Sequence, residues 1–204
     1  MEPDRQLSRR ELIRRVSTFL GGFAFVGGSG LLDAAERASV PVDGAVGAFS
    51  ADDVTFLDEI AETILPATKT PGAKAAKTGA FMALMVTDVY RPDQQRIFRA
   101  GMRRVDDAAK QAHAASFMAA APEQRLALLT ALDHEQKRVM DARDPDNTDQ
   151  PPHFFRMMKE LALLGYFTSE VGCVQAMRYI EVPGRFEPCL PYRSGDPAWA
   201  ERPY

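Results

Sequence analysis

The sequence is short of cysteine and of positive charge, and each shortage excludes a class of function. Cys173 and Cys189 are the only two cysteines, and they stand too far apart to form the Cys-x-x-Cys-His motif that attaches c-type haem. The 25 Lys and Arg residues are outnumbered by 28 Asp and Glu residues, which gives a net charge of -3. Proteins that hold a phosphate backbone usually have a basic excess. We therefore expect neither covalently attached haem nor a nucleic-acid partner.

The local motifs of nucleotide binding and of serine hydrolysis are missing as well. The nearest approach to the Gly-x-Gly-x-x-Gly of a dinucleotide fold is Gly28-Ser29-Gly30, which continues as Leu-Leu-Asp. The sequence contains no Gly-Lys-Ser/Thr phosphate loop and no Gly-x-Ser-x-Gly nucleophile elbow. We therefore expect no cofactor in this chain.

The histidines provide the alternative interpretation. His134-Glu135 begins like a zinc-protease helix, but Arg138 stands where the second histidine is needed, one turn later. A metal site assembled from His113, His134 and His153, with carboxylates from distant positions, would make the chain a stand-alone helical enzyme or metal-binding protein.

The N-terminus resembles a twin-arginine export signal. Ser8, Arg9, Arg10, Leu12 and Ile13 match its pattern of a hydroxyl residue, two arginines and two apolar residues, and a basic residue follows. A weakly apolar stretch at 16–32 comes next, and several glycines make it a poor membrane-spanning helix. We expect residues 1–48 to be a signal and linker, without a clear cleavage site, and the protein to be periplasmic. The twin-arginine translocon moves proteins that are already folded, usually with a cofactor inserted, so the signal raises the question of where that cofactor lies.

The rest of the chain predicts an all-α fold, a small helical bundle over residues 49–181. Ser50 and two following aspartates begin a helix that Pro66 ends, and Pro92 and Pro122 suit the first turns of two others. Further helices are predicted over 73–90, 153–164 and 169–179. Apolar spacing predicts these core residues outside the first helix: Phe81, Leu84, Met85, Ile97, Phe98, Met102, Val105, Ala109, Leu126, Leu129, Leu132, Val139 and Met140.

Residues 182–204 contain five prolines, which excludes regular helix and predicts an extended arm. An extended chain exposes much contact surface per residue, so we expect this arm to bind a partner.

Three blocks of the sequence resemble the gluconate 2-dehydrogenase subunit 3 family. The first is Glu-Thr-Ile-Leu-Pro at 62–66 with Thr-Pro-Gly-Ala at 70–73. The second is Phe-Phe-Arg-Met-Met-Lys-Glu-Leu at 154–161, which continues into Gly-Tyr-Phe-Thr-Ser-Glu at 165–170 and Gly172. The third is Val-Pro-Gly at 182–184 with Cys189 and Pro191. The Gly-Tyr-Phe-Thr-Ser-Glu block is the most specific of these.

The resemblance implies a non-catalytic small subunit. In that family the small subunit binds a large FAD-containing catalytic subunit of the glucose-methanol-choline type and supplies its export signal. A multihaem cytochrome c often completes the complex, which is associated with the inner membrane. The substrates of related complexes include gluconate, glucose, sorbitol and the 3-position of glucosides, so the sequence does not name the sugar.

The marked residues have more than one interpretation. Gly165 is predicted to end one helix, and Ser169 to cap the next. The aromatic residues of the second block form either a partner interface or part of the core. In an oxidising compartment, Cys173 and Cys189 either bond to each other or leave Cys189 to bond the partner, and we slightly favour the second arrangement. The candidate interface residues are Phe154, Phe155, Tyr166, Phe167, Phe186, Cys189 and Tyr192.

Overall fold

The computed structural model describes residues 46–144, 150–182, 184, 189, 191 and 193–200. The chain divides into two units, Met1–Val42 and Asp43–Tyr204, and every described residue belongs to the second. The predicted export signal, with Ser8, Arg9, Arg10, Leu12 and Ile13, therefore lies outside the described residues, as do Phe186 and Tyr192.

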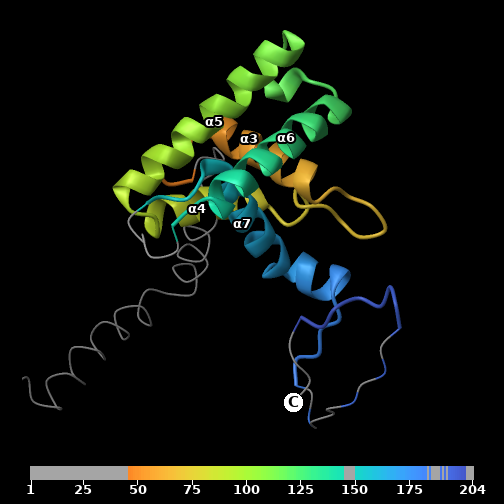
Figure 1. Ribbon diagram of the computed structural model, residues 1–204. Coiled ribbons are helices and arrows are strands. Elements are labelled where there is room, and N and C mark those ends of the chain that lie inside the picture. The colour runs from red at the N-terminus through yellow and green to blue at the C-terminus, as the bar shows by residue number, and fades with distance from the viewer. Residues whose placement is uncertain are drawn as a thin grey trace, which may run out of the picture. The chain divides into compact units, whose positions relative to one another are not determined.

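The described residues form helices and no strand, which confirms the all-α prediction (Figure 1). Two isolated β-bridges join Val46 to Phe49 and Arg178 to Trp199. The helices are α3 (Ala51–Ile64), α4 (Thr78–Asp88), α5 (Pro92–His113), α6 (Pro122–Asp141) and α7 (Phe154–Phe167), with a 3-10 helix η1 (Phe117–Ala119) and a π-helix η2 (Gly172–Ala176).

Helix α7 is the centre of the bundle. It contacts α3, α4, α5 and α6, and it leads on to η2 and the C-terminal segment (Figure 1). Its sequence explains this position, because apolar residues cover most of its circumference, and such a helix must be buried. The buried residues of α7 are Phe154, Phe155, Met157, Met158, Leu161, Ala162, Gly165 and Tyr166.

Four helices begin as the sequence predicts, or within a residue of it. The Ser50 hydroxyl accepts a hydrogen bond from the Asp53 backbone N–H at 3.2 Å, and the Asp53 carboxylate accepts one from the Ser50 N–H at 3.0 Å. This reciprocal pair satisfies two of the backbone donors that the start of a helix leaves free. Pro92 and Pro122 occupy the first turns of α5 and α6. His153 caps α7, with its Nδ1 accepting from the Phe155 N–H at 3.2 Å.

Helix α4 differs from the prediction in its start and in its buried face. Residues 73–77 form turns instead of helix, and Lys77 adopts a left-handed conformation with φ of 52°. Leu84, a predicted core residue, is exposed, whereas Gly79 and Ala83 are buried. The reason is close packing on α3, since a Cβ at Gly79 would lie 2.6 Å from the Val54 carbonyl oxygen. The small residues of α4 therefore face the core.

The predicted core residues of α6 are confirmed in the middle of the helix but not near its ends. Leu129 and Leu132 are buried, but Leu126 and Val139 are exposed. A helix of 20 residues is about 30 Å long, whereas the 14-residue α7 against which it packs is about 21 Å long. Helix α6 is thus longer than the surface that can cover it.

The predicted helix end at Gly165 is wrong, because α7 continues to Phe167. Gly165 is needed for close packing instead: a Cβ there would lie 2.5 Å from a ring carbon of Phe81. The predicted helix 169–179 is also shorter than expected. Residues 170–171 are helical, and the π-helix η2 follows at once and ends before Met177.

The core begins earlier than residue 49. Val46 and Phe49 exchange two backbone hydrogen bonds of 3.0 Å, and both side chains are buried. The Arg99 guanidinium lies 4.0 Å from the Phe49 ring centroid, so α5 holds this turn. Residues 46–48, expected to be linker, therefore belong structurally to the bundle.

Candidate functional site

The loop between α3 and α4 is organised by the carboxylate of Glu62. Its two oxygens accept hydrogen bonds from the backbone N–H groups of Ala67 at 2.9 Å and Lys74 at 2.8 Å. Gly72 is buried against the same carboxylate, and a Cβ at this position would overlap it. Glu62 thus replaces the backbone partners that an irregular loop lacks.

Tyr166 joins this loop to the C-terminal end of α7. Its phenolic hydroxyl donates a 2.6 Å hydrogen bond to the carbonyl oxygen of Pro71. Pro71 belongs to the first of the three sequence blocks and Tyr166 to the second, so the structure brings these two blocks together.

The turn after α7 is fixed by Ser169. The Ser169 hydroxyl donates to the Tyr166 carbonyl oxygen at 2.6 Å and accepts from the Gly172 N–H at 3.0 Å. The predicted capping role of Ser169 is confirmed. A Cβ at Gly172 would overlap the Tyr166 carbonyl oxygen, so only glycine fits there without movement of the backbone. The Cys173 thiol lies 3.2 Å from the Phe167 carbonyl oxygen.

Ion pairs connect the helices around this centre. Glu59 of α3 pairs with both Lys74 and Arg125. Lys159 of α7 donates to both carboxylate oxygens of Asp133 in α6, at 2.7 and 2.8 Å.

A third ionic cluster links α5, α6 and the cap of α7. Glu135 lies 2.6 Å from an Arg104 guanidinium nitrogen and 3.3 Å from His153 Nε2. Each of these side chains has a partner on another element, which is typical of structural pairing.

The pKa shifts follow from these contacts. The hydrogen bond from Lys159 holds the pKa of Asp133 below its usual value. Burial alone would raise the pKa of Glu135, but hydrogen bonds from Arg104 and His153 reverse this, and its pKa is lowered. At Asp58, burial prevails over the hydrogen bond from the Gly79 N–H, and its pKa is raised. These carboxylates have structural partners on neighbouring elements.

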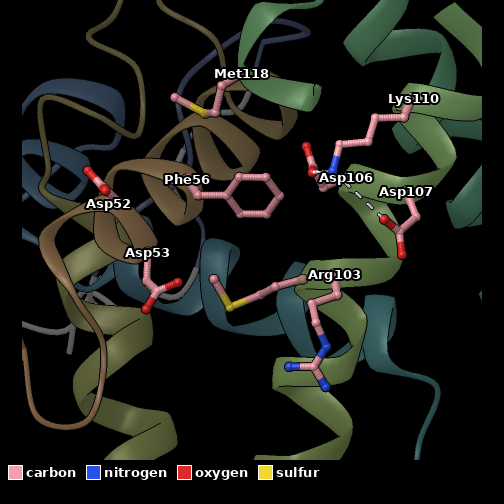
Figure 2. A pocket seen from close by; sticks show the side chains of 9 residues that line it. Asp52, Asp53, Phe56, Arg103, Asp106, Asp107, Lys110 and Met118 are labelled. Carbon is pink, nitrogen blue, oxygen red and sulfur yellow. Dashed lines mark ion pairs between the residues drawn. The ribbon is translucent and has the colours of Figure 1, made fainter. Parts of the chain in front are cut away.

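A groove of about 460 Å³ lies between the first turn of α3 and α5 (Figure 2). Phe56 lies in the middle, with Asp52 and Asp53 on one side and Asp106, Asp107 and Lys110 on the other (Figure 2). Lys110 pairs with Asp106 at 2.6 Å, and this hydrogen bond lowers the pKa of Asp106. Asp53 is already used in the cap of α3. The carboxylates of Asp53, Asp106 and Asp107 are thus engaged within the chain.

The structure divides the predicted interface aromatics. Phe154, Phe155 and Tyr166 are between 1 and 6% exposed, so they belong to the core and are not available to a partner. Phe167 is 38% exposed and lies on the surface. For the first three residues, core packing is therefore the correct one of the two interpretations.

The cysteines are free thiols in this structure. Cys173 is half-buried and Cys189 is exposed, and no bridge joins them. The bond between Cys173 and Cys189 is thus not formed here, and a bond from Cys189 to a partner stays a prediction.

The histidines do not converge on a metal site. Among residues 46–144 and the described part of 150–200, no group of three or more His, Cys, Asp or Glu side chains is placed to hold a metal ion. His153 instead caps α7, and His134 is one of the residues that line a cavity of about 260 Å³ between α3, α6 and α7. The three-histidine site is therefore not formed. Within the same described residues, no helix has the length and apolar character needed to span a membrane.

The family follows from comparison with known proteins. The family model described as gluconate 2-dehydrogenase subunit 3 matches residues 51–184. This range includes α3 to η2, the Glu62 loop and the Tyr166–Pro71 contact. The chain belongs to the gluconate 2-dehydrogenase subunit 3 family. No curated protein and no solved structure matches it.

Because the subunit 3 family consists of subunits of dehydrogenase complexes, the surface of the chain is where a partner would be contacted. Six of the eleven large exposed apolar residues in the described part of the chain lie between the last turn of α7 and the start of the arm: Leu164, Phe167, Val174, Tyr179, Ile180 and Val182. These residues lie close together along the chain, and each exposes much of its side chain.

Some important residues were not singled out from the sequence. Glu62 stood inside the first block, but its partners are backbone groups that no sequence pattern names. Arg178 and Trp199, which form a β-bridge, were missed completely. The only available signal was that Trp199 is the single tryptophan of the chain and lies in its Pro-rich segment.

Proposed function

We propose that this chain is the non-catalytic small subunit of a periplasmic, FAD-dependent sugar dehydrogenase. In this proposal the FAD belongs to a catalytic subunit of the glucose-methanol-choline type, and a multihaem cytochrome c receives the electrons. The family match over residues 51–184 is the observation that carries the proposal. The small subunit stabilises the catalytic chain and escorts it through the twin-arginine translocon to the inner-membrane surface.

The exposed apolar stretch supports a large protein partner. Val182 is 78% exposed and Val174 is 55% exposed, and neither has a role in the core of this chain. Leaving such side chains in water forgoes about 25 cal/mol for each Å² of apolar surface. A partner that covers this stretch recovers that free energy, which gives the small subunit its affinity.

Cys189 is the proposed point of covalent attachment to the catalytic subunit. It is exposed, whereas the Cys173 thiol contacts the Phe167 carbonyl oxygen. On non-reducing gels of the purified complex we expect a cross-linked band that Cys189→Ser abolishes. Cys173→Ser is the matched control and should leave the band. A small subunit that migrates alone without reductant rules the cross-link out.

The export role is tested by where the catalytic subunit accumulates. The chain is co-expressed with a flavoprotein of the glucose-methanol-choline type from the same genome, and the periplasmic fraction is assayed for flavin and for sugar oxidation. Replacing Arg9 and Arg10 by lysine keeps the charge but removes the arginine pair, and we expect the flavoprotein to stay in the cytoplasm. Replacing Arg14 and Arg15 by lysine is the control. If the flavoprotein is still exported with the Arg9 and Arg10 replacements, the escort role is wrong.

A further inference from the structure

Arg178 holds the C-terminal segment against the chain that leaves η2. Its backbone N–H donates to the Ala198 carbonyl oxygen at 2.8 Å, and its carbonyl oxygen accepts from the Ala200 N–H at 2.8 Å. Its Nε donates to the Pro197 carbonyl oxygen at 2.8 Å. The guanidinium carbon lies 4.6 Å from the centroid of the Trp199 ring. We name these contacts between Arg178 and residues 197–200 the Arg178 clasp.

The clasp changes how the Pro-rich arm is presented. The arm was predicted to be an extended tail; the clasp brings its described residues 197–200 back to Arg178 and so closes a loop in the chain. Closing a loop of this length costs chain entropy. The β-bridge between Arg178 and Trp199 and the contacts of the Arg178 side chain offset this cost. Trp199 is only partly exposed. The two ends of the loop are therefore already together before any partner arrives.

The base of this loop is also where the exposed apolar residues lie. Tyr179 and Ile180 follow Arg178 directly and are 44% and 43% exposed, and Val182 comes two residues later. They extend, along the chain, the exposed apolar stretch that starts with Leu164 and Phe167. The family match ends at residue 184, so this stretch lies within the part of the chain that the family shares.

We propose that the Arg178 clasp preorganises the base of this loop as the docking surface for the flavin-bearing catalytic subunit. The inference rests on the proposed function, since it names the surface that the partner covers. With the clasp closed, Tyr179, Ile180 and Val182 are held in one arrangement. Binding then does not have to order Tyr179, Ile180 and Val182, and the conformational entropy that is not lost increases the affinity for the partner. An open clasp leaves only a fraction of the molecules competent, and the apparent affinity falls by that fraction.

The clasp is tested in the isolated subunit by fluorescence. Trp199 is the only tryptophan of the chain, so its emission reports on the clasp alone. In Arg178→Ala we expect acrylamide quenching of Trp199 to rise by about two-fold, because the cation over the ring and the Nε hydrogen bond are lost. Arg193→Ala removes the same charge from the same exposed loop and should leave quenching unchanged. Equal quenching in both variants overturns the clasp.

The docking role is tested with the co-expressed flavoprotein. We expect Arg178→Ala to bind it about three- to ten-fold more weakly than wild type or Arg193→Ala. Val182→Asp, which leaves the clasp intact, should weaken binding without changing the quenching of Trp199. If the clasp opens and affinity is unchanged, or if Val182→Asp instead splits a dimer of the small subunit, the docking surface is wrong. If the wild-type chain does not bind the flavoprotein at all, the proposed function itself fails.

Discussion

The hydroxyl of Tyr166 and the carbonyl oxygen of Pro71 are joined by a 2.6 Å hydrogen bond although the two residues stand 95 positions apart. Tyr166 is 4% exposed, so water cannot readily take over the bond. This contact fixes the end of the central helix against the Glu62 loop, just before the turn that Ser169 forms.

Removing the Tyr166 hydroxyl should loosen this junction. We expect Tyr166→Phe to lower the free energy of unfolding by about 1–2 kcal/mol, because the Pro71 carbonyl loses its partner in a poorly hydrated site. Urea unfolding followed by circular dichroism measures the change. Tyr179→Phe, at an exposed tyrosine, is the control and should be neutral within about 0.5 kcal/mol. Equal stability of the two variants would show that the bond contributes nothing.

Gly165 should not accept even one added methyl group. Its Cβ would lie 2.5 Å from the Phe81 ring, so Gly165→Ala is expected to destabilise the bundle by about 1–3 kcal/mol despite the better helix propensity of alanine. Combining it with Phe81→Leu, which shortens the opposing side chain, should recover part of the loss in a double-mutant cycle. Strictly additive effects would contradict the contact.

Burial of Asp58 should make the folded protein less stable as pH rises. Its pKa is raised chiefly by burial, so the stability of the fold falls as pH rises past the usual pKa of the carboxyl group. Asp58→Asn keeps an oxygen for the Gly79 N–H without a charge and should be neutral or stabilising at pH 7. Asp58→Ala leaves that N–H, now bonded at 2.6 Å, without a partner and should cost about 1–3 kcal/mol. Thermal unfolding of both variants decides the matter, and a loss in Asp58→Asn equal to that in Asp58→Ala would contradict it.

The Asp133–Lys159 pair should contribute stability that acid removes. The hydrogen bond from Lys159 lowers the pKa of Asp133 below its ordinary value of 3.8 in the folded state. The stabilisation is therefore complete above that value and is lost as pH falls through the lower, folded pKa. Because both side chains are about one third exposed, the effect is about 0.5–1 kcal/mol at pH 7.

Unfolding of Asp133→Asn at pH 7 and pH 3 measures this difference. We expect the variant to be weaker than wild type at pH 7 and closer to it at pH 3. Asp141→Asn lies on the same helix, at a position without an ion pair among the described residues, and should show no such pH dependence. A deficit that is constant with pH would assign the loss to something other than the ion pair.

The sequence predicted where helices occur better than it predicted which face of each helix is buried. Ser50, Pro92 and Pro122 carry local signals that act within a few residues, and each begins a helix as expected. The buried face of α4 depends on how closely α3 approaches Gly79, which is a tertiary effect. Apolar periodicity alone therefore selected Leu84, which lies in solvent.

The candidate site shows the same division. The blocks around Tyr166 were found from sequence, and their meeting at Pro71 was not, because one hydroxyl-carbonyl bond across the fold leaves no periodic signal. Gly165 was interpreted as a local helix stop. The structure shows instead that a side chain at this position would collide with the Phe81 ring on another helix. The Arg178 clasp escaped for the same reason, since residues 178 and 199 pair only after the chain has turned back.

The most direct test of the central claim is the absorbance spectrum of the affinity-purified chain, expressed alone and together with a glucose-methanol-choline-type flavoprotein from the same genome. An accessory subunit predicts flavin absorbance and sugar oxidation in the co-expressed sample, and neither of these in the chain alone. Sugar oxidation by the isolated chain, or a co-expressed sample that contains no flavin, would contradict the account.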